Sequence, residues 1–210
     1  MVVPVRDDAD GVAHLLDSLE ATGDQLAAVV VVDDGSTDAD ALVDVVDRPR
    51  SGPVVRLLRR ERSDGPAAAR NDGAAQARSP LVAFLDADCT VGPGWLDVLL
   101  GHFDDERVAA VAPRVVAAPS SQPGTGGYAV WGVDRVRSPL DLGDRAALVA
   151  PGRRVSYVPS AALVVRRDAV VQLDGFDPSL RVCEDVDLIW RLAASGHLVR
   201  YEPLATVAHE

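Results

Sequence analysis

The chain has 210 residues, 48% of them hydrophobic, a length and composition typical of one folded α/β-sized domain and not of a disordered segment. Its formal charge of -11 would repel a phosphate backbone, and no basic stripe with interleaved aromatic residues offsets that charge, which argues against a nucleic-acid partner. All 21 basic residues are arginine, so mechanisms that need a catalytic lysine are excluded.

Cysteine content and hydropathy predict a cytoplasmic domain. Cys89 and Cys183 are too few for a disulfide framework and lack metal-ligand spacing, so we expect free thiols in a reducing compartment. No apolar run reaches the length of a membrane span, and the N-terminus lacks a signal-peptide pattern. The chain opens on an apolar strand pattern and stops at His209-Glu210, which we interpret as the ends of a domain excised from a longer protein.

Short valine-rich runs alternate with helical patterns through the first half of the chain. We predict strands at residues 2–5, 26–32, 54–58 and 81–85, and helices at residues 12–19 behind Asp10 as cap, at 38–46 and at 66–77. Continuous apolar strands separated by helices predict a parallel sheet that is covered on both faces. Ligands of such sheets bind beyond the carboxyl ends of the strands, where Asp33, Asp34, Asp86 and Asp88 lie.

The second half of the chain is less regular. A predicted helix at residues 94–103 and a strand at 108–116 precede a stretch rich in Gly, Pro and Ser, and little periodicity returns before residue 155. Long irregular segments inside compact domains are often binding loops or lids, so we predict a mobile loop over residues 117–155. The remaining predicted elements are strands within 155–165, helices at 167–173 and 184–194, and strands at 199–201 and 205–207.

Two acidic pairs are candidates for chemistry. Asp33 and Asp34 precede Gly-Ser, where a carboxylate could equally cap the next helix. Asp86 and Asp88 straddle one alanine after an apolar strand. Two carboxylates so close repel each other unless a cation or a hydrogen-bond donor lies between them, so a divalent ion is favoured over a polar turn for the second pair.

Three other polar side chains have ordinary explanations on spacing alone. Arg70 lies in an alanine-rich helix, where arginine is usually a surface residue. Glu184 opens a helix, and an acidic first turn complements the helix dipole. His209 follows a short apolar strand and would matter only if it approached Asp86 and Asp88.

Two phosphoryl-transfer families share short motifs with this chain. Residues 84–90 fit Asp-x-Asp-x-Thr and resemble the nucleophile motif of haloacid-dehalogenase-type phosphatases, while residues 31–35 resemble the acidic pair of response-regulator receivers. Both families rely on a downstream lysine, and the phosphatases place their motif on the first strand, whereas here it follows the fourth. We therefore reject both interpretations.

A third resemblance covers the whole chain. Six motifs follow in the order of family 2 glycosyltransferases of GT-A fold: Val-Pro-Val at 3–5, Val-Asp-Asp-Gly-Ser at 32–36, Gly-Pro-Ala-Ala-Ala-Arg-Asn at 65–71, Phe-Leu-Asp-Ala-Asp at 84–88, Asp-Gly-Phe-Asp at 174–177 and Cys-Glu-Asp at 183–185. Residues 111–115, 138–143, 157–167 and 184–192 further resemble the glycosyltransferases of the mycofactocin system.

This resemblance implies an α/β fold with a mixed, mostly parallel central sheet and a Rossmann-like nucleotide-binding N-terminal half. It implies one GT-A domain over residues 1–210, with a nucleotide-sugar-binding half at 1–116, the mobile loop at 117–155 and an acceptor and catalytic half at 156–210. From its composition and length alone, we expect that loop to close over the donor or to admit the acceptor.

Donor contacts are also implied residue by residue. Val5 and Arg6 would border uracil, Asp34 would bond its polar edge, and Arg70 would brace the base or the acidic residues. Arg6 stands where the broader family often has Tyr-Asn. Asp86 would touch the ribose or a metal-bound water.

The resemblance further implies a catalytic centre. Asp88 would ligate Mg²⁺ or Mn²⁺, with His209 as a further ligand, and Asp185 would be the base. The implied reaction moves a sugar, expected to be glucose, from a UDP-sugar to a hydroxyl of a peptide-derived redox cofactor, with inversion at the anomeric carbon. Two alternatives stay open: a truncated domain that binds nucleotide-sugar without turnover, and a family 2 transferase acting on a polysaccharide or lipid-linked acceptor.

Overall fold

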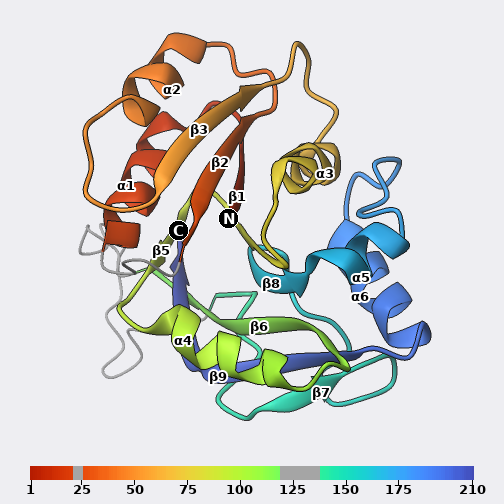
Figure 1. The fold of residues 1–210 in the computed structure, drawn as a ribbon. Coiled ribbons are helices and arrows are strands. Elements are labelled where there is room, and N and C mark those ends of the chain that lie inside the picture. The colour runs from red at the N-terminus through yellow and green to blue at the C-terminus, as the bar shows by residue number, and fades with distance from the viewer. Residues whose placement is uncertain (21–25, 119–137) are drawn as a thin grey trace, which may run out of the picture.

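A computed structural model describes residues 1–20, 26–118 and 138–210 (Figure 1). The strands are β1 (Val2–Val5), β2 (Ala28–Asp33), β3 (Val54–Arg59), β4 (Leu81–Leu85), β5 (Cys89–Val91), β6 (Val108–Ala117), β7 (Ala147–Val149), β8 (Ala162–Arg166) and β9 (Leu198–His209). The helices are α1 (Ala9–Leu19), α2 (Ala39–Val46), α3 (Pro66–Gln76), α4 (Trp95–Leu100), a 3-10 turn (Gly101–Asp104), α5 (Arg167–Gln172) and α6 (Glu184–Ala194).

One mixed sheet joins these strands in the order β3-β2-β1-β4-β8-β6-β9-β5, with β7 paired to β9. Strands β1 to β4 pair in parallel, as predicted for the N-terminal half. Among the named strands of the described C-terminal half, β6 and β9 are the parallel pair. Strand β8 lies antiparallel between β4 and β6, and β5 and β7 run antiparallel to β9. Parallel pairing therefore predominates in the N-terminal half alone, because β8 enters the sheet against the direction of both its neighbours.

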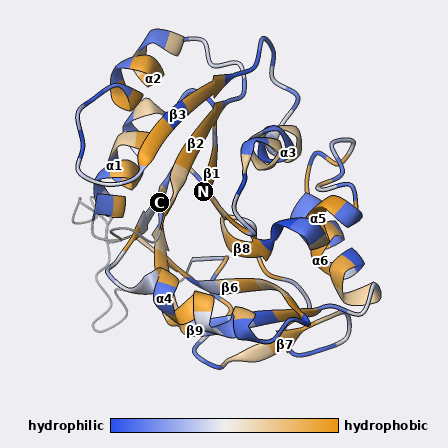
Figure 2. Ribbon diagram, in the orientation of Figure 1, coloured by the Kyte–Doolittle hydropathy of each residue, from blue (hydrophilic) through white to orange (hydrophobic). Residues whose placement is uncertain are grey.

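Helices cover both faces of the sheet. In Figure 1, α1 and α2 lie on one side of β1, β2 and β3, and α3 lies on the other. The buried residues form two clusters that match these faces, one with α1, α2 and α4 and one with α3, α5 and α6. Figure 2 shows the central strands in the colours of hydrophobic residues, whereas the helices around them carry both kinds. Burial on both faces explains the continuous apolar strands of the sequence.

Several predicted elements need correction. The N-cap of α1 is Asp8, whose carboxylate accepts a hydrogen bond from the Gly11 N–H, and not Asp10, which lies in the first turn. The two short strands predicted at 199–201 and 205–207 are one strand, β9, which crosses an irregularity in its pairing with β6. Strand β5 was not predicted, because three residues carry too little pattern; pairing with β9 makes it a strand.

The loop predicted over residues 117–155 is only partly described, since residues 119–137 lie outside the described residues. The described remainder contains β7, a strand that the sequence did not predict, and Asp141, which pairs with Arg114 of β6 at 2.8 Å. This part of the segment is therefore joined to the sheet. Within the described ranges, no helix combines the length and apolarity that crossing a bilayer requires.

Candidate active site

A cavity of about 1120 Å³ opens at the carboxyl ends of the parallel strands. Its lining includes all five residues predicted to contact a donor: Val5, Arg6, Asp34, Arg70 and Asp86. Asp88 lines it as well, together with residues 178–181 and Glu184 from the C-terminal half of the chain. The parallel half of the sheet and the start of α6 thus form one site.

Asp33 and Asp34 have different roles: one has the structural role and the other the ligand-site position that the sequence left open. Asp33 is fully buried and its Oδ1 accepts a hydrogen bond from the Ser36 N–H at 2.7 Å, so it organises the turn after β2. Asp34 lines the cavity. Only the second carboxylate of the pair borders the cavity.

Asp86, Asp88 and His209 form a compact group at the edge of this cavity. One ligand atom of each lies within 4.8 Å of the others, and His209 Nε2 is 3.4 Å from Asp88 Oδ1. The pairing of β5 with β9 sets Cys89 opposite His209, which carries the imidazole from the end of the chain to the acidic pair.

This group fits a divalent cation. Asp88 Oδ1 is buried and accepts no hydrogen bond from the described residues, so this oxygen can coordinate a cation. Burial raises the pKa of Asp88, an effect that His209 opposes and the charge of Asp86 reinforces. Carboxylate oxygens with one imidazole suit Mn²⁺ or Mg²⁺, and a bound cation would offset the repulsion between the carboxylates.

Arg70 links this group to helix α6. Its guanidinium lies 2.6 Å from Asp86 Oδ1 and 2.9 Å from Glu184 Oε1, and it stacks over the Phe176 ring at 5.5 Å. The side chain is only 4% exposed, so the expectation of a surface arginine is wrong. The family resemblance allowed Arg70 to contact either the base or the acidic residues. The described structure contains the contact with the acidic residues. A buried guanidinium is stabilised here because both its neighbours are anionic.

Glu184 is the site residue that sequence reasoning missed. Its place in a first helical turn is a sufficient local explanation, yet its side chain is buried against Arg70, 114 residues away in the chain. The only local signal was its position beside Asp185 in the Cys-Glu-Asp motif. A local charge pattern cannot report a partner on another element.

Asp185 is not among the residues that line the cavity, but it follows Glu184, which does, and is half-buried at the start of α6. Its Oδ2 accepts a hydrogen bond from the Ser160 N–H at 3.2 Å. The carbonyl of the next residue, Ala161, accepts one from the Asp86 N–H at 2.9 Å. Two connections therefore hold Asp185 near the acidic group: the backbone at residues 160–161, and the Arg70 to Glu184 ion pair.

Glu184→Gln is expected to lower the free energy of unfolding by about 1–3 kcal/mol, because the neutral amide leaves the buried Arg70 charge with Asp86 alone. Urea denaturation followed by circular dichroism measures this. Glu106→Gln, at an exposed position, is the matched control and should change stability by less than about 0.5 kcal/mol. Equal stability of the two variants would show that the ion pair between Arg70 and Glu184 does not stabilise the fold.

Comparison with known proteins supports one family. Residues 1–157 match the family model described as "Glycosyl transferase family 2". The chain is 44% identical over all 210 residues to the "Pre-mycofactocin glycosyltransferase" of Mycobacterium tuberculosis, and spans 42% of that protein. It is 32% identical over 203 residues to the "Succinoglycan biosynthesis protein ExoU" of Rhizobium meliloti, covering 93% of this chain and 57% of the relative. The chain thus spans about half the length of these curated relatives.

Solved structures share the fold. GalNAc-T7 with UDP, GalNAc and Mn²⁺ superposes with a TM-score of 0.76 at 19% identity, over 99% of this chain and 43% of that one. The mannosyltransferase PcManGT from Pyrobaculum calidifontis, in complex with GDP-Man and Mn²⁺, gives 0.73 at 18% identity, over 99% and 55%. S. aureus TarS 1-349 in complex with UDP-GlcNAc gives 0.71 at 21% identity, over 95% and 54%. The GT-A fold expected from the sequence is therefore confirmed.

Proposed function

The chain belongs to glycosyl transferase family 2, and on that basis we propose that it transfers a sugar from a UDP-sugar to an acceptor hydroxyl, with inversion at the anomeric carbon. The observation that carries the proposal is the group of Asp86, Asp88 and His209, of which the two carboxylates line the large cavity, with Asp185 next to the cavity-lining Glu184. The donor would lie along the cavity, with the base near Val5, Arg6 and Asp34 and the diphosphate near the acidic group.

The side chains of this group support a metal-dependent reaction. Asp88 and His209, with Asp86 beside them, would hold Mg²⁺ or Mn²⁺. When bound, such a cation neutralises the negative charge that develops on the leaving diphosphate. GalNAc-T7 and PcManGT share the fold and were both crystallised with Mn²⁺, which supports a metal site here.

Asp185 is proposed as the general base. As the bond between the acceptor oxygen and the anomeric carbon forms and the bond to the diphosphate breaks, its carboxylate would take the proton of the acceptor hydroxyl. The Ser160 N–H hydrogen-bonds Oδ2 and orients the carboxylate beforehand. By pairing with both Asp86 and Glu184, Arg70 would hold the acidic group and the start of α6 at a fixed distance while donor and acceptor are aligned.

The proposed acceptor is a peptide-derived redox cofactor, a precursor of mycofactocin, and the proposed sugar is glucose. The support is the 44% identity to the pre-mycofactocin glycosyltransferase and the motifs shared with that system. The 32% identity to ExoU favours a second candidate, a saccharide or lipid-linked acceptor. Because the chain spans less than half of the first relative, a domain that binds nucleotide-sugar without turnover is the third candidate.

A thermal-shift titration with UDP, GDP and UDP-sugars, each with and without Mn²⁺, tests the proposal together with an assay of UDP release. We expect UDP to raise the melting temperature only when Mn²⁺ is present, and UDP release from the matching UDP-sugar when acceptor is added. Binding without release would favour the domain that lacks turnover. UDP binding that does not depend on Mn²⁺, or no UDP binding at all, would contradict the proposal.

A further inference from the structure

Arg60, just beyond β3, pairs with three carboxylates from three parts of the chain. Its Nη1 lies 2.6 Å from Asp34 Oδ1, its Nη2 3.1 Å from Asp64 Oδ2, and its Nε 2.9 Å from Asp72 Oδ2. Each guanidinium nitrogen thus pairs with a different acidic residue. Asp34 follows β2, Asp64 lies in the loop before α3, and Asp72 lies on α3. The Arg60 side chain is 15% exposed. This arrangement ties the three segments together.

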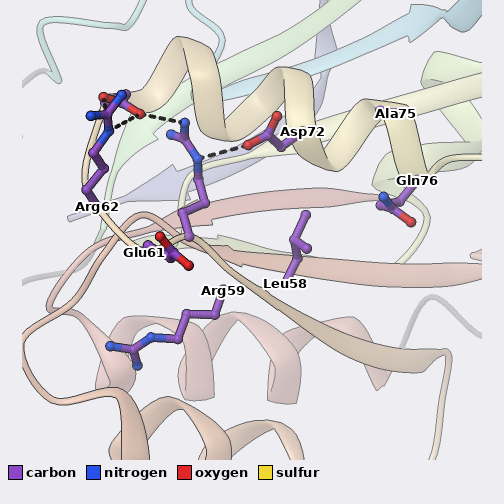
Figure 3. Close-up of a pocket in the computed structure, with 9 residues that line it drawn as sticks. Leu58, Arg59, Glu61, Arg62, Asp72, Ala75 and Gln76 are labelled. Atoms are coloured by element: carbon purple, nitrogen blue, oxygen red, sulfur yellow. Dashed lines mark hydrogen bonds and ion pairs between the residues drawn. The ribbon is translucent and has the colours of Figure 1, made fainter.

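Arg60 lies behind the large cavity. It lines a smaller one of about 600 Å³ between the end of β3 and α3, where Figure 3 shows Asp72 and its ion pair. Among the described residues that line the large cavity are Asp34, Ser63 and Asp64, but not Arg60. Arg60 therefore does not line the large cavity itself, but it pairs with Asp34 and Asp64, which do.

The Asp34 carboxylate is fully engaged by the loop at residues 60–65. Its Oδ1 accepts hydrogen bonds from Arg60 Nη1 at 2.6 Å and the Asp64 N–H at 3.2 Å. Its Oδ2 accepts from Ser63 Oγ at 2.7 Å and the Gly65 N–H at 2.9 Å. A carboxylate offers about four acceptor sites, so these four bonds leave none free. With its acceptor sites filled, Asp34 shapes the base end of the large cavity through the loop that it holds.

We propose that Arg60 is a positioning residue for nucleotide recognition: it fixes Asp34 and the loop at residues 60–65 as one rigid wall at the base end of the large cavity. This inference rests on the proposed function and deepens it. Ser63 belongs to the same wall, since its hydroxyl also accepts a hydrogen bond from Arg6 at 3.3 Å. The selectivity of the site for uracil then depends on an arginine that does not touch the base.

Removing the guanidinium should loosen this wall while the acidic group remains unchanged. In Arg60→Met, the loss of a charged hydrogen bond at Asp34 should weaken UDP affinity by about tenfold or more. The preference for UDP over GDP should fall with it, because the change lies at the base end. In turnover, the rise in the donor KM should exceed any fall in kcat.

Arg78→Met, at an exposed position outside the loop at residues 60–65, is the matched control. Arg78 lines neither cavity, so UDP affinity should stay within about twofold of wild type. Arg60→Lys is a second variant for the case in which Arg60→Met does not fold. It keeps the charge, but a single ammonium cannot reproduce the three-way fork, so reduced UDP affinity is again expected.

Isothermal titration of wild type and variants with UDP and GDP in Mn²⁺ measures both quantities, at a temperature where circular dichroism shows all of them folded. A folded Arg60 variant with wild-type UDP affinity and selectivity would overturn this inference and leave the proposed function intact, even if its melting temperature fell. A wild type that binds no nucleoside diphosphate would overturn both.

Discussion

Asp185→Asn should remove sugar transfer while leaving UDP and Mn²⁺ binding as in wild type. General-base catalysis contributes typically about 10²–10⁴ in rate, and kcat should fall by that factor because an amide cannot accept the acceptor proton. The asparagine keeps the size of the side chain and an oxygen for the Ser160 N–H, so the start of α6 should keep its geometry. UDP release under saturating donor gives kcat, and thermal shift gives binding.

Asp187→Asn is the matched control for this experiment. It makes the same substitution two residues further along α6, at a carboxylate that pairs with Arg191 at 2.6 Å. We expect kcat within about twofold of wild type, since loss of a half-exposed helical ion pair has only a small effect on stability. Equal kcat values for Asp185→Asn and wild type would reject Asp185 as the base. Loss of UDP binding in Asp185→Asn would instead assign it to the donor site.

Asp88→Ala should abolish the effect of Mn²⁺ on both stability and turnover. In wild type, Mn²⁺ with UDP at a hundred times the dissociation constant should stabilise the fold by about 2.7 kcal/mol, and in the variant this gain should disappear. Without metal, the variant should be at least as stable as wild type, because it removes a carboxylate whose charged form is disfavoured by burial and whose Oδ1 accepts no hydrogen bond within the described parts of the chain.

Urea denaturation with and without Mn²⁺ and UDP measures both effects. Asp104→Ala removes an exposed carboxylate from the 3-10 turn and serves as the control that should keep the full response to Mn²⁺. If Asp88→Ala still gained stability from Mn²⁺ as wild type does, the cation site would have to lie elsewhere. If it lost stability without metal, the carboxylate would have a structural role that its contacts do not reveal.

Much of the site was predictable because its residues stand at strand ends. Apolar runs identified β1, β2 and β4, and residues that follow parallel strands meet at one edge of a sheet whatever the details of packing. Asp34, Asp86 and Asp88 could therefore be grouped from the order of strands and helices alone. The ordered motifs added the family, which the comparison with known proteins confirms.

The contacts that complete the site depended on tertiary structure. His209 approaches Asp88 because β5, too short to recognise in the sequence, pairs with β9. Arg70 and Glu184 meet across 114 residues, each with an ordinary local explanation. Nothing in the local pattern distinguishes Arg60 from its arginine neighbours.

The alternation of strands and helices, the acidic strand ends and the family could all be predicted from the amino-acid sequence. They follow from hydrophobic periodicity and from short motifs, which are properties of residues close together in the chain. The pairing of side chains came from the folded chain: Arg70 is buried between two carboxylates, Asp34 is held by the loop behind it, and an imidazole joins the acidic pair. Such pairings depend on strand register and helix rotation, which are set by packing between segments far apart in the chain.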